Sequence, residues 1–286
     1  MFKEDVSKRK HPFSFEVMSK IQFIFISAFL ILLVCCLAFS NAPLSDQLAW
    51  TSIFILLLGI PHGAIDHVLL TEKISINKFW FYSLYLGLIT INTVLWFVLP
   101  GLSLLFFLLV SAYHFGQSQL SFLPESFLSK LLFILWGISI LSGLLLYNSS
   151  DIDWLLMNTS EFGISSFEGL LYEVKLITIT STASVILLLG YFLYKNKITL
   201  EKMGLELIDL FLVHASFYIL PLLIGFTLYF IILHSLKVMV DEFEFLKSKK
   251  PSFNISKFIA LLTPFSLLSF IGSAIIIALI FNGWLN

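Results

Sequence analysis

The sequence predicts an all-α protein that crosses a membrane many times, as a polytopic bundle of about nine transmembrane helices with a cytoplasmic N-terminus. Two observations predict this class. Of the 286 residues, 58% are hydrophobic and only 12% are charged, whereas soluble domains carry about 25% charged residues. Apolar runs also recur at about 20 residues, the length that a helix needs to cross about 30 Å of hydrocarbon.

The chain starts with a polar, basic leader, residues 1–20, which contains His11 and which we interpret as cytoplasmic. A signal peptide is disfavoured because the apolar run that follows is longer than a typical signal core. We expect the remainder to form one transmembrane helical domain, residues 21–286. Its nine predicted spans are 21–39, 50–70, 79–99, 102–123, 131–147, 176–194, 205–220, 222–240 and 258–285.

The lysines favour this count, because cytoplasmic loops concentrate Lys and Arg. If the chain has nine spans and a cytoplasmic N-terminus, Lys175 is the only Lys or Arg residue predicted on the outer side. The longest outer loop is acidic instead. We therefore expect a multi-pass protein of the inner, cytoplasmic membrane, and the net charge of −1 gives no basic surface for nucleic acid.

Histidines recur at one membrane depth. His62, His114 and His234 each lie 12 residues after the outer start of their runs at Trp50, Leu102 and Leu222, or about 18 Å into the bilayer. His214, on a run of the opposite direction, reaches nearly the same level. Because neutral imidazole is a common metal ligand, four imidazoles in one apolar slab predict a metal site.

Each polar group also has a plainer interpretation. A single membrane histidine such as His214 most often hydrogen-bonds between helices. On an unbroken helix, His67 lies about 140° around the axis from His62, so the two could not face one metal. Asp66 shares the face of His62 and is a plausible outer acceptor for its ring, and Asp209 could act similarly or reach the interface.

Three segments carry a resemblance to a known family. Residues 61–67 (PHGAIDH), 113–116 (YHFG) and 229–235 (YFIILHS) resemble the signature segments of the Brp/Blh family of membrane β-carotene 15,15'-dioxygenases. The resemblance implies an enzyme that splits β-carotene at its central double bond with O2 to give two retinals, commonly for a rhodopsin. The apolar carotenoid would enter from lipid.

The resemblance further implies that His62, His114 and His234 are catalytic ligands of Fe(II). We predict His214 as the fourth metal ligand. The supporting residues expected around the ligands are Asp66, His67, Tyr113 and Asp209.

The family pattern would place another histidine one turn after His234, where this chain has Val238. Two hypotheses follow: a three-histidine site completed by His214 or His67, or a divergent, non-catalytic carotenoid or retinal binder. A bis-histidine haem protein is a further alternative. The chain lacks the HExxH motif that would indicate a metalloprotease. The adjacent Cys35 and Cys36 lack the spacing of zinc or redox sites.

Overall fold

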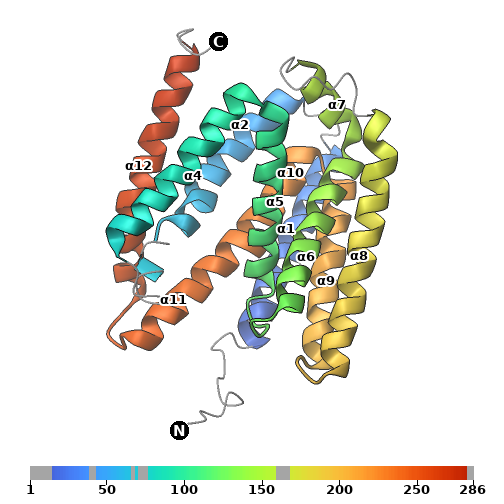
Figure 1. The fold of residues 1–286 in the computed structure, drawn as a ribbon, viewed down its shortest axis with the longest axis vertical. Helices are drawn as coiled ribbons and strands as arrows, with labels where there is room; N and C mark the ends of the chain where they lie inside the picture. The colour runs from blue at the N-terminus through green and yellow to red at the C-terminus, as the bar shows by residue number, and fades with distance from the viewer. Residues whose placement is uncertain (1–14, 39–42, 66–67, 70–76, 159–167, 282–286) are drawn as a thin grey trace.

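The computed structural model describes residues 15–38, 43–65, 68–69, 77–158 and 168–281, and every regular element in these ranges is helical (Figure 1). The all-α prediction is confirmed for this part of the chain. The elements are α1 (Phe15–Ala38), α2 (Leu44–Phe54), η2 (Ile55–Gly59), η3 (Ile60–Gly63), α4 (Lys78–Val98), α5 (Pro100–Gln119), α6 (Phe127–Tyr147), α7 (Ser149–Asn158), η5 (Glu168–Leu170), α8 (Leu171–Tyr194), α9 (Leu200–Ile219), α10 (Leu222–Leu228), η6 (Tyr229–Leu236), α11 (Lys237–Lys249) and α12 (Ile255–Phe281).

Helix starts follow local sequence signals. The side chains of Asn77, Ser126 and Thr199 accept hydrogen bonds from backbone N–H groups at the starts of α4, α6 and α9, which satisfies donors that have no partner within the helix. Pro100 opens α5 directly after Leu99, where a proline without an N–H group is tolerated. The result is a tight hairpin between α4 and α5.

Five helical segments among the described residues are long and apolar enough to cross a membrane: Pro100–Gln119, Phe127–Tyr147, Glu168–Tyr194, Leu222–Lys249 and Ile255–Ile275. The protein is therefore a multi-pass membrane protein. Shorter apolar helices cover Lys20–Cys35 and Tyr82–Val98. The count of nine spans, their direction and the domain boundary at residue 20 stay predictions.

The second predicted span, 50–70, does not form one regular helix. Its α-helix gives way to the π-helical η2 and then to the 3-10 segment η3, which contains Pro61. A proline inside a helix removes a backbone hydrogen bond and disturbs the preceding turn. The acidic loop expected after Tyr147 also begins with an unpredicted helix, α7.

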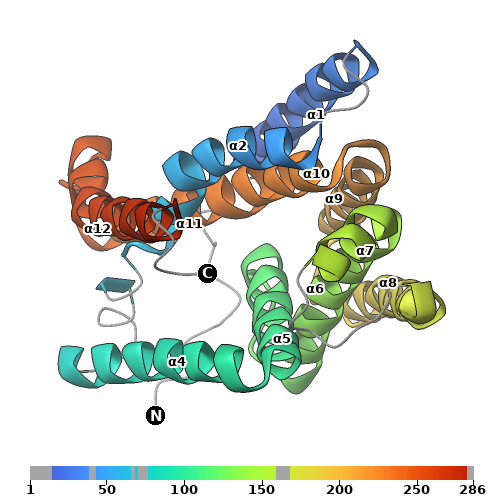
Figure 2. The same ribbon diagram turned by 90° about the horizontal axis from the view of Figure 1, so that it is seen from above.

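Helices α5, α6, α8 and α9 form the closely packed side of the molecule (Figure 2). Gly116 and Gly137 permit this packing between α5 and α6, because a Cβ at either position would overlap the backbone of Phe133 or Ala112 on the facing helix. Small residues at such crossings allow membrane helices to approach closely. Trp136 fills the interior beside them.

Helices α4 and α12 lie at the periphery of the other side (Figure 2) and expose many large apolar side chains, including Phe97 and Leu268. Such surfaces match a lipid environment rather than water. The segment η6, which carries His234, contacts both η3, which carries His62, and α5, which carries His114.

Candidate metal centre

Three of the predicted histidines converge. His62 on η3, His114 on α5 and His234 on η6 each place one ring nitrogen within 4.8 Å of the others. The ring centroids of His234 lie 4.9 Å from His62 and 5.0 Å from His114, and those of His62 and His114 are 6.2 Å apart. Segments far apart in the sequence therefore present their imidazoles to one point.

Two of these histidines depend on irregular helix. His234 lies within the π-helix η6, and His62 follows the π-helix η2 by one short 3-10 segment. Single π-turns inside helices occur frequently at functional sites. The two π-helices contact one another, and Gly59 makes this possible, since a Cβ there would lie 2.6 Å from Cε1 of Phe230.

Hydrogen bonds orient two of the rings. Nδ1 of His62 contacts the carbonyl oxygen of Gly59; because a carbonyl only accepts, this nitrogen carries the proton, and Nε2 holds the lone pair. Nδ1 of His234 lies 3.0 Å from Oγ of Ser118, whose hydroxyl donates to the carbonyl of Phe115 at 2.9 Å. His234 therefore donates from Nδ1 as well, and its Nε2 is the available ligand atom.

The burial of His234 supports a metal. Its side chain is 2% exposed, and Nε2 is buried without a hydrogen-bond partner among the described residues. An unpartnered polar atom in an apolar interior is costly, and a cation at the meeting point of the rings would satisfy it. Three neutral nitrogen donors suit a divalent transition metal and bury no negative charge.

Aromatic rings enclose one side of the cluster. Phe230 stacks on His234 with centroids 5.5 Å apart and meets His62 edge-on, while Phe115 meets His234 edge-on at 4.8 Å. His114 is exposed. The centre is therefore shielded by phenyl rings on the side of His234 and accessible beside His114.

The predicted fourth ligand, His214, lies outside this cluster. Its Nε2 is 3.1 Å from Oγ of Ser139, and its Nδ1 is 3.2 Å from the hydroxyl of Tyr147. Ser139 is in turn 2.6 Å from Oγ1 of Thr182. A ligand role would require the ring to give up these contacts.

The predicted supporting residues are dispersed. The ring of Tyr113 packs against Phe133 on α6. Asp209 accepts hydrogen bonds from Gln22 at 2.7 Å and from Gln119 at 2.9 Å. Asp66 and His67 lie outside the described residues.

Sequence reasoning missed Gly59, Ser118 and Ser235. Oγ of Ser235 lies 3.3 Å from Nδ1 of His62, on the helix opposite to it. The position of Gly59, one turn before His62, is a usable signal, because a carbonyl there is within reach of the ring. Ser118 and Ser235 carried no comparable signal, since each contacts a histidine of another helix.

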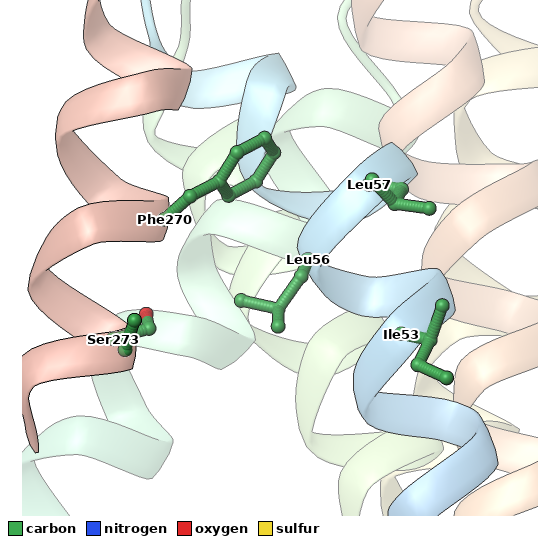
Figure 3. A pocket seen from close by; sticks show the side chains of 6 residues that line it. Ile53, Leu56, Leu57, Phe270 and Ser273 are labelled. Carbon is green, nitrogen blue, oxygen red and sulfur yellow. The ribbon is translucent and has the colours of Figure 1, made fainter. Parts of the chain in front are cut away.

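An apolar cavity of about 250 Å³ lies between the α2–η2 segment and α12 (Figure 3). Leu56 and Phe270 face one another across it. The other lining residues are Ile53, Leu57, Ser273 and Ala274. This lining offers mainly dispersion contacts to a hydrocarbon chain.

A family model described as beta-carotene 15,15'-dioxygenase matches residues 53–284, a range that includes all three clustered histidines. The chain belongs to this dioxygenase family. Family membership confirms the resemblance inferred from the three segments.

A beta-carotene 15,15'-dioxygenase from uncultured marine bacterium 66A03 is 36% identical over 76 residues, which cover 25% of this chain and 28% of that relative. The chain therefore aligns with less than a third of the length of this relative. No solved structure matches the chain.

Proposed function

We propose that this protein is an iron-dependent membrane dioxygenase that cleaves the central double bond of β-carotene with O2 to give two retinals. The observation that carries the proposal is the convergence of three imidazoles around the buried, unpartnered Nε2 of His234. Membership of the dioxygenase family supports the same reaction.

The reaction breaks one carbon–carbon double bond, and each carbon receives one oxygen atom from O2 as an aldehyde. His62, His114 and His234 would hold Fe(II) in the proposed site. The metal would supply oxygen activation, because three protein ligands leave other coordination positions open for O2.

The protein's own groups exclude water and position the reactants. Phe115 and Phe230 cover the rings of His234 and His62, so the centre stays apolar on that side. The exposure of His114 provides access for a substrate that arrives from lipid. Because a carotene has no polar end group, apolar packing must select the bond that reacts.

The proposal includes the setting of the enzyme. We place it in the inner membrane as a single domain of nine spans, residues 21–286, after a cytoplasmic leader. Retinal would pass to an acceptor such as a rhodopsin.

Expression of the full chain in carotene-accumulating cells, with extraction and quantification of retinal, tests the function. We expect retinal from the native chain and none from His234→Ala. The matched control, His214→Gln, should retain retinal formation.

One observation favours a second candidate, a non-catalytic carotenoid binder: Val238 stands where the family pattern suggests another imidazole. Carotene that copurifies with the native chain without retinal would support this candidate and contradict the dioxygenase. A Soret band in the purified protein would instead indicate haem bound by two histidines.

A further inference from the structure

Ser118 contacts the proposed metal centre and a buried cation at the same time. Its Oγ lies 3.0 Å from Nδ1 of His234, and its backbone carbonyl accepts a hydrogen bond from Nζ of Lys237 at 2.6 Å. The side chain and the backbone of one residue on α5 therefore both contact the helix that carries His234.

The carbonyl of Ser118 is one of the last four of α5, which ends at Gln119. These carbonyls have no partner within their own helix. Cations stabilise the negative end of a helix dipole. The ammonium group of Lys237, on another helix, thus supplies both a hydrogen-bond donor and a positive charge at the C-terminal end of α5.

Lys237 is itself held firmly. Its side chain is only 6% exposed, and its Nζ lies 3.3 Å from Oδ2 of Asp241, one turn further along α11. This acid balances the lysine charge, which would otherwise oppose a metal cation nearby. Lys237 follows His234 by three residues, at the point where the π-helix η6 continues directly into α11.

We propose that Ser118, Lys237 and Asp241 form a positioning clamp for the metal site, an inference that rests on the proposed function. Lys237 fixes the end of α5 against α11, and Ser118 then holds the Nδ1 proton of His234. In this arrangement Nε2 of His234 stays directed at His62 and His114. Ser118 and Lys237 are positioning residues, since they act through His234.

The clamp has a structural alternative in which Lys237 only joins two helices. That role would change the stability of the protein without changing the metal. Metal affinity and the spectrum of the bound metal therefore separate the two interpretations.

The test uses the full chain purified in detergent and titrated with Co(II), whose visible absorption reports the ligand geometry. Ser118→Ala, which removes one hydroxyl group, should weaken Co(II) affinity by about 10-fold to 100-fold, as substitutions of partners of metal-bound histidines do. It should also change the absorption spectrum. Ser118→Thr, which keeps the hydroxyl, should restore both.

Lys237→Met should weaken Co(II) affinity by a smaller factor than Ser118→Ala, because Lys237 acts on His234 only through Ser118, and Lys237→Arg should recover most of the loss. The matched control is Lys202→Met, because Lys202 also pairs with an acid four residues on, Glu206, at 2.9 Å. This control should leave the affinity and the spectrum unchanged. Thermal unfolding of each variant measures stability separately.

Unchanged Co(II) affinity and spectrum in Ser118→Ala, with or without a lower unfolding temperature, would overturn the clamp. Tighter Co(II) binding by Lys237→Met would also overturn it, because the lysine would then act only as a repelling charge. If Lys237→Met does not fold, the Co(II) affinities and spectra of Ser118→Ala and Ser118→Thr decide between the clamp and the purely structural role. Absence of Co(II) binding by the native chain would overturn the metal site of the proposed function, and the clamp with it.

Discussion

The bundle contains two kinds of histidine environment, and the difference lies in the second ring nitrogen. In the three-histidine cluster, His62 and His234 each use Nδ1 for a hydrogen bond, and Nε2 of His234 has no partner among the described residues. At His214, Ser139 and Tyr147 occupy both nitrogens. The comparison shows that membrane depth and residue type do not distinguish a histidine of the cluster from a histidine that joins helices.

The backbone conformation around these histidines also differs. His214 lies on the regular helix α9, whereas His62 and His234 lie beside or within π-helical turns. A π-turn shifts the face on which the following side chains project, and it costs regular hydrogen bonding. Irregular helix therefore accompanies two of the three clustered histidines, whereas the third, His114, lies on the regular helix α5.

The largest expected effect is that of removing a clustered histidine. His234→Ala should reduce metal affinity by more than about 100-fold, beyond the range seen for outer partners of metal ligands, because no other described nitrogen can replace Nε2. The loss of affinity is measured by the metal content of the purified protein and by Co(II) titration. Retention of one metal per chain would contradict the site.

Val238→His should strengthen the cluster. Position 238 lies one helical turn after His234, and side chains four residues apart share a helix face. We expect metal affinity to rise by about 10-fold, which corresponds to about 1.4 kcal/mol, together with more retinal in carotene-accumulating cells. Val238→Gln is the matched control, and an equal gain from it would show that the imidazole is not the cause.

Gly59→Ala tests the close approach of the two π-helices. The new Cβ would lie 2.6 Å from Cε1 of Phe230, and overpacking of this kind costs about 1–3 kcal/mol. Since Phe230 stacks on His234, we expect a lower unfolding temperature and a metal affinity several-fold weaker. Gly190→Ala should change neither, because a Cβ there meets nothing within 4 Å.

His214→Gln should have the smallest effect on the metal. A glutamine amide can donate and accept, so it can keep contacts to Ser139 and Tyr147, and hydrogen bonds between membrane helices contribute about 0.6 kcal/mol on average. Co(II) affinity should be unchanged, with a slightly lower unfolding temperature. A loss of affinity comparable to that of His234→Ala would instead establish His214 as the fourth ligand.

The sequence predicted more of the clustered histidines than of the residues around them. His62, His114 and His234 were identified from their motifs and common depth, and the structure brings them together. The same depth argument also selected His214, which the structure leaves in a separate polar network with Ser139, Tyr147 and Thr182. Depth is only one coordinate, and the direction of each side chain around its helix is decided by packing.

Gly59 and Ser118 show why the surroundings were harder to predict. Gly59 is required by the ring of Phe230, which is 171 positions further along the chain. Ser118 contacts His234 on another helix. Local propensity and hydrophobic pattern carry no information about such pairs, because both depend on how separate helices are rotated against one another.

The amino-acid sequence by itself determined the membrane location, the all-α class, the family and the three histidines, because composition and short motifs are properties of the chain alone. Tertiary structure alone decided which imidazoles meet and which ring nitrogen of His234 is available. The physical reason is that three of the ring partners come from other helices: Ser118 for His234, Ser235 for His62 and Ser139 for His214. Only the carbonyl of Gly59, which contacts His62, is local in the sequence.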